Sequence, residues 1–300
     1  MIDRASTFAQ PEIVELLKTR FVPVAIDQAC QRRQKDSEGE FYRKIASQSP
    51  RNNFNATTQG FYIATPRGDL MLYNNNRDPA KLLRLMKERL REYNLGAHTK
   101  RVLPLNPEIV DPRYTIEAPQ GGLVVRVQAK VLDGYQQAKS SSQAIFQSAI
   151  SRDNLWITQS EHESVLAGRF PRKLAERIAR FHLVDNTRGE PPMWKKDEIR
   201  SLEMKLDEGE LTGSVHLETA DGQRGYVTEL RGQIEVDDDQ VRVFDVVSLG
   251  EFWGEGRFTR NAPEGRFPLV VTFRLADGSD VADPLPPQGA RGWVDGYLKN

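Results

Sequence analysis

The chain of 300 residues is poor in cysteine, in long apolar runs and in excess charge. Its single cysteine, Cys30, excludes an intrachain disulfide and a cysteine-rich zinc site, and a lone thiol cannot run a dithiol redox cycle. No run approaches the roughly 18 apolar residues of a membrane-spanning helix. Basic and acidic side chains both number 42, so the balance gives no signal for a nucleic acid partner.

The length favours two domains rather than one. We expect a first domain over residues 1–95, a linker over 96–113 and a second domain over 114–300. Four residues that interrupt helices and strands mark this linker: Gly96, Pro104, Pro107 and Pro112.

Helical and strand patterns alternate along the first domain. The expected elements are a helix over 11–19, a buried strand over 21–26, a helix over 41–46, strands over 60–64 and 69–73, and a helix over 78–93. Pro66-Arg67-Gly68 predicts a tight turn that makes the two later strands antiparallel. Asp78 and Pro79 are typical of the cap and first turn of the last helix.

Thr7-Phe8, followed by the stretches 11–17 and 21–27, resembles the pattern of the thioredoxin-like superfamily. The resemblance covers residues 1–95 and implies an α/β sheet fold. In that family the paired redox cysteines stand shortly before this phenylalanine, which here puts them before Met1. The opening strand of the family is not found either, so a redox motif encoded upstream of Met1 is one expectation left open.

Two further positions bear on redox chemistry. The resemblance places Gln59 where the family carries a cis-proline. A cis peptide bond before a residue other than proline costs about 2.5–4 kcal/mol, so we expect the bond before Gln59 to be trans. Cys30 does not stand at the family's redox position. We interpret it as a structural thiol, with activation by the neighbouring Arg32 and Arg33 as the alternative.

Long alternating patterns dominate the second domain from residue 199 to 275 and predict an antiparallel meander of about five strands. Strands over 124–132 and 155–157 and a helix over 171–182 precede it. The predicted fold class is α+β: a thioredoxin-like α/β domain, then a mainly antiparallel β domain with one or two helices. A partly closed barrel and a sandwich both remain open for this β domain.

Arginines concentrate in one segment of the second domain. Arg172, Arg177 and Arg180 decorate the predicted helix, and Arg188 follows in a loop. Guanidinium groups suit carboxylate or phosphate, so these four residues form a candidate binding patch; a solvated basic helix face is the alternative.

Other candidates have plainer interpretations. The four histidines do not pair at metal spacing, and Asp237–Asp239 fits a strand turn better than a calcium loop, so we expect no metal site. Four aromatic residues could line a pocket in the β domain, with core packing as the favoured interpretation: Trp194, Phe252, Trp253 and Phe258. We expect no catalytic residue and no cofactor.

The leading functional hypothesis is a non-redox binding or scaffold module with an unknown protein or small-molecule partner, fused to a β-rich domain. The alternatives are a truncated thiol-disulfide oxidoreductase and a β domain that binds a small ligand. Asp3 and Arg4 interrupt any signal-peptide core. Localisation therefore stays open between the cytoplasm and a mature or fragment form of an exported protein.

Overall fold

The computed structural model describes residues 7–76, 78–93, 109–290 and 292–299. The chain divides into two compact units, here called the N-terminal unit (residues 3–116) and the C-terminal unit (residues 117–300). Most of the expected linker over 96–113 lies outside the described residues. Near its end, the Asp111 N–H donates to Asp36 at 3.0 Å, and Asp111 accepts from the Lys35 N–H at 2.9 Å. These bonds make Asp111 part of the N-terminal unit.

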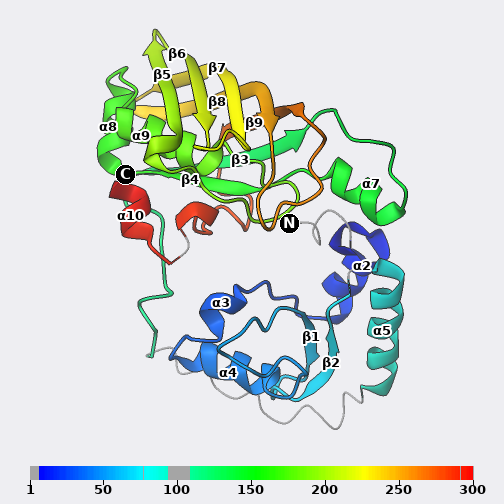
Figure 1. Cartoon of the computed structure of the whole chain (residues 1–300). Coiled ribbons are helices and arrows are strands. Elements are labelled where there is room, and N and C mark those ends of the chain that lie inside the picture. Colours follow the sequence, from blue (N-terminus) through cyan, green and yellow to red (C-terminus); the bar gives the residue numbers. More distant parts are fainter. Residues whose placement is uncertain (1–6, 77, 94–108, 291, 300) are drawn as a thin grey trace. The chain divides into compact units, whose positions relative to one another are not determined.

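The N-terminal unit combines short helices with one hairpin (Figure 1). Its elements are η1 Thr7–Ala9, α2 Pro11–Arg20, α3 Gln28–Gln31, α4 Ser37–Ala46, β1 Phe61–Ala64, β2 Leu70–Asn74 and α5 Pro79–Glu92. Asp78 caps α5 by accepting the Lys81 N–H at 2.8 Å, and β1 pairs with β2 antiparallel. The predicted helices at 11–19, 41–46 and 78–93 and both hairpin strands are confirmed, with α4 starting earlier than expected.

The predicted buried strand over 21–26 is wrong. Residues 21–27 have no regular secondary structure, and the two-stranded sheet of this unit contains only β1 and β2. The apolar run predicts a buried strand, but Val22 is 90% exposed and Val24 is 75% exposed. The unit's small core forms instead from Ile13, Ile63, Leu82 and Met86 on α2, β1 and α5.

The C-terminal unit is built on one curled, seven-stranded antiparallel sheet (Figure 1). The strands are β3 Leu123–Val131, β4 Asp153–Ile157, β5 Ile199–Asp207, β6 Glu210–Glu218, β7 Gly225–Asp237, β8 Gln240–Trp253 and β9 Arg266–Leu275. Their order is β4-β3-β9-β8-β7-β6-β5, which confirms the meander over 199–275. This half-barrel leaves β4 and β5 as edges, so of the two alternatives left open by the sequence the partly closed barrel is formed and the sandwich is not.

The helices of this unit are few and short. They are α7 Ser141–Ser148, α8 Gln159–Leu166, α9 Arg172–Arg177, η2 Ile178–His182, η3 Lys196–Glu198, η4 Gln288–Ala290 and α10 Val294–Lys299. The helix predicted over 171–182 is formed by α9 and by η2, which is a π-helix. Leu174, Ile178 and Ala179 pack into the same core as the sheet's buried side chains.

Particular residues permit one tight turn and one close approach between strands of this sheet. Asp238 and Asp239 have positive φ values of 48° and 56° and form the tight turn between β7 and β8. Gly250 on β8 stands where a Cβ would lie 2.0 Å from the Val227 carbonyl oxygen. Glycine is therefore required where β7 and β8 approach each other closely.

The concave side of the sheet is filled by the unit's own side chains. Six aromatic residues in this core are at most 3% exposed: Trp194, Tyr226, Phe244, Phe252, Phe267 and Phe273. Of the four aromatic residues considered for a pocket, Trp194 and Phe252 are buried, Trp253 is half-buried and Phe258 is exposed. Trp194 and Phe252 therefore belong to the core, and the four residues do not line one ligand cavity.

Candidate functional site

Cys30 is the only cysteine of the chain, so no second thiol stands near Cys30 or Gln59. Cys30 is half-buried in the single turn of α3, whose cap, Asp27, accepts the Ala29 N–H at 2.8 Å. The Gln28 side chain accepts the Thr58 N–H at 3.1 Å and so ties α3 to the residue before Gln59. No cis peptide occurs among the described residues, so the bond at Gln59 is trans, as expected.

The four candidate arginines do not share one exposed surface. Arg172 is exposed and pairs with Glu176 at 3.0 Å on its own helix. Arg180 donates from Nε to the Trp194 carbonyl at 3.0 Å, and its guanidinium lies over the Phe181 ring. Arg177 and Arg188 are buried, which leaves them closed to a partner in solution.

Arg177 anchors the C-terminal helix from inside the protein. Its guanidinium pairs with Glu161 at 2.6 Å and donates to the carbonyls of Tyr297 at 2.9 Å and Leu298 at 2.6 Å. Glu161 also accepts the Thr158 N–H at 3.0 Å in the capping box of α8. One buried cation thus joins α8, α9 and α10.

Arg188 closes the loop that follows η2. It pairs with Asp185 at 2.6 Å and donates to the Thr259 carbonyl at 3.2 Å and to the Tyr135 hydroxyl at 3.1 Å. Burial raises the pKa of Tyr135, which keeps this phenol neutral and able to accept from Arg188. These contacts hold the loop rather than offer a binding site.

His182 also lies inside the protein rather than at a solvated helix end. Its Nε2 lies 2.7 Å from the Tyr297 hydroxyl, and its Nδ1 lies 3.3 Å from Asp153 Oδ2. Asp153 Oδ1 accepts the Gln288 N–H at 2.9 Å. Since all three side chains are buried, this cluster resembles a catalytic relay in composition but has no access for a substrate.

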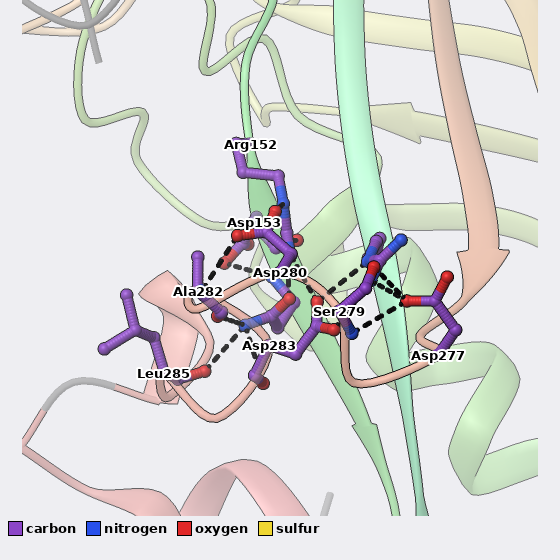
Figure 2. A network of polar contacts seen from close by, with 10 residues as sticks. Arg152, Asp153, Asp277, Ser279, Asp280, Ala282, Asp283 and Leu285 are labelled. Atoms are coloured by element: carbon purple, nitrogen blue, oxygen red, sulfur yellow. Dashed lines mark hydrogen bonds and ion pairs between the residues drawn. The ribbon is translucent and has the colours of Figure 1, made fainter. Parts of the chain in front are cut away.

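Sequence reasoning missed the densest polar network, which we call the aspartate clamp: Arg126, Arg152, Asp277, Asp280 and Asp283 (Figure 2). Arg126 binds both oxygens of Asp283, at 2.8 and 2.7 Å, and also contacts Asp277. Arg152 contacts Asp283 at 2.8 Å and Asp280 at 3.4 Å. The clamp fastens the segment after β9 to β3 and to the start of β4.

Hydrogen bonds lower the pKa of the clamp carboxyl groups. Hydrogen bonding from Arg126 lowers the pKa of Asp283, and the backbone N–H of Ala282 lowers that of Asp280. Asn154 adds amide bonds to the carbonyls of Ala282 at 2.7 Å and Leu285 at 2.8 Å (Figure 2). Within the described residues, no three His, Cys, Asp or Glu side chains have the geometry to hold a metal ion.

The stretch Phe21–Asp27, which we call the extended segment, exposes apolar side chains to solvent. Phe21 and Asp27 both have extended backbone angles, and Phe21 packs against the core of the unit. Val22, Val24 and Ile26 are 90%, 75% and 43% exposed. No backbone group of residues 22–26 hydrogen-bonds to another described residue.

Comparison with known proteins gives no relative for this arrangement: no protein-family model, no curated protein and no solved structure matches the chain. Among the described residues, no helix is both long enough and apolar enough to cross a membrane. The extended segment and the buried networks are therefore the features that bear on function.

Proposed function

We propose that the chain is a non-redox binding protein whose N-terminal unit captures an extended stretch of another polypeptide. The observation that carries this proposal is the extended segment, with three exposed apolar side chains and an unbonded backbone over residues 22–26. A strand with free N–H and C=O groups is a template for pairing with a second strand.

The energetics favour such a partner. Covering an exposed Val or Ile side chain contributes about 1.5–3 kcal/mol when burial is complete. Val22 and Val24 are largely exposed, so most of that stabilisation is still available to a partner. Main-chain hydrogen bonds to the partner would add affinity, and side-chain contacts would add specificity.

The proposal assigns no binding role to the C-terminal unit. Its concave face is filled by its own aromatic core, and Arg177, Arg188 and His182 are occupied internally. We propose that it acts as a rigid β-rich body joined to the binding unit. The thioredoxin-like origin of the N-terminal unit remains a hypothesis that rests on the sequence pattern, since the strand expected over 21–26 is not formed.

Selection from a displayed library of random peptides on the whole chain tests the proposal. We expect enriched peptides to bind the unmodified chain and to lose at least about tenfold in affinity on Val24→Asp. Val281→Asp is the matched control, because Val281 is 95% exposed and lies in the C-terminal unit. Selection that yields no binder, or yields binders unaffected by Val24→Asp, would reject the proposal.

A further inference from the structure

The extended segment offers two different edges, and only one of them is intact. In a strand, the N–H and C=O of one residue point to the same side, and successive residues alternate sides. In a strand conformation, residues 22, 24 and 26 present three N–H and three C=O groups along one edge. The other edge contains Pro23, which has no N–H to donate.

The same alternation places the apolar side chains. In that conformation Val22, Val24 and Ile26 share one face, because side chains in a strand repeat every two residues. Phe21 is the one residue of this stretch that packs against the core of the unit. A partner strand along the even-numbered edge would lie beside Val22, Val24 and Ile26, where alternate apolar side chains can cover them.

The charge around the segment is strongly one-sided. Residues 18–35 contain a single acidic residue, Asp27, which is engaged as the cap of α3. They contain five basic residues: Lys18, Arg20, Arg32, Arg33 and Lys35. Of these, Lys18, Arg20, Arg33 and Lys35 are exposed, and none of the four makes an ion pair with a described residue.

We infer that the partner is an extended peptide with alternating apolar residues and acidic residues at its ends, and that it pairs with the even-numbered edge of residues 22–26. This inference rests on the proposed function and specifies its partner. Opposite charges at the rim of an interface select the partner and speed its association, whereas the covered apolar face holds it. The exposed cations on both sides of the segment match a peptide that is acidic at both ends.

A pair of proline variants tests which edge binds. Val24→Pro removes an N–H from the even-numbered edge, whereas Ala25→Pro removes one from the edge that Pro23 already interrupts. Neither N–H is bonded in the structure, so both variants keep the existing contacts. The probe is a synthetic peptide of alternating valine and threonine with two glutamates at each end, and binding is measured by calorimetry on the whole chain.

We expect Val24→Pro to weaken binding of this probe at least about tenfold and Ala25→Pro to change it less than about threefold. Equal losses in the two variants would overturn the assigned edge. Probes with glutamine or lysine in place of glutamate test the charge, and we expect the order glutamate, glutamine, lysine, with differences that shrink at high salt.

Other results separate this inference from the proposed function. If glutamine or lysine probes bind as well as the glutamate probe, the partner class is wrong while capture at the segment stands. If library-selected peptides bind at Val24 but the glutamate probe does not, this inference alone fails. If the free chain self-associates and Val24→Pro abolishes that association, the occupant is a second copy, which overturns the partner assigned here.

Discussion

The two units of this chain satisfy their polar and apolar groups to different extents. In the C-terminal unit, seven strands pair in one sheet, aromatic residues fill the concave face, and buried arginines hydrogen-bond to carboxylates and helix-end carbonyls. The N-terminal unit has a two-stranded sheet and a small core, and it leaves an apolar stretch extended in solvent. The exposed apolar stretch without backbone hydrogen bonds therefore lies in the unit whose β structure is least complete.

The largest expected effect tests whether buried ion pairs hold the C-terminal unit together. Arg177→Met leaves Glu161 buried without its cation and frees the carbonyls of Tyr297 and Leu298. We expect a loss of about 3–5 kcal/mol in the free energy of unfolding. All four tryptophans lie in this unit, so urea unfolding followed by tryptophan fluorescence reports on it. Arg172→Met, on the exposed face of the same helix, should cost less than about 0.5 kcal/mol.

The small N-terminal core provides the second test. Leu82→Ala removes one of its four fully buried apolar side chains and should cost about 2–5 kcal/mol. Hydrogen exchange of the amides in β1 and α5 measures this loss. The control is Leu83→Ala, since Leu83 is only partly buried at the same helix, and it should cost clearly less. Equal effects would mean that this unit is not organised around the core described.

The third test concerns acid sensitivity of the aspartate clamp. Asp283→Asn weakens the charge-assisted bonds to Arg126 and Arg152 and should cost about 1.5–3 kcal/mol at pH 7. Because the folded-state pKa of Asp283 is lowered, its contribution is present above the ordinary pKa of about 3.9 and is lost as the pH falls below it.

The difference in the free energy of unfolding between the original chain and Asp283→Asn should therefore shrink from about pH 5 to about pH 2, because Asp283 takes up its proton over that interval. Urea unfolding at several pH values measures this. Asp245→Asn is the control, since Asp245 is exposed and lies 3.8 Å from Arg274. A difference that stays constant down to pH 2 would contradict an ionised clamp.

The smallest expected effect concerns Cys30. Cys30→Ala removes the only thiol from the turn α3 and should change stability by less than about 1 kcal/mol. A disulfide-reductase assay should show no turnover by the original chain and no change in the variant. Turnover that depends on Cys30 would replace the binding proposal with thiol chemistry.

Local signals in the sequence predicted much of this fold. Asp78 and Pro79 marked the start of α5, the Pro66–Gly68 turn predicted the β1–β2 hairpin, and strict alternation predicted the meander after residue 199. Each of these depends on neighbours within a few residues. The stretch 21–26 differs because an apolar run predicts a strand without showing whether a second strand covers it.

The buried polar networks were harder to predict, because their partners lie far apart in the sequence. The aspartate clamp joins Arg126 to Asp283 across more than 150 residues, and no local pattern relates them. The position of Arg177 in the sequence does indicate burial. It stands three residues after Leu174 and four before Phe181, which places it on the apolar stripe of its helix rather than on the solvated face.

Amide exchange at Val22, Val24 and Ile26 in the free chain tests the central claim most directly. Measured by nuclear magnetic resonance on the whole chain, these three amides should exchange within about tenfold of the rate for an unstructured peptide, because they are exposed and unbonded. The amides of β1 that pair with β2 provide the protected reference in the same unit. Slowing of the three amides by more than about a hundredfold would show a strand already paired, and would contradict the account.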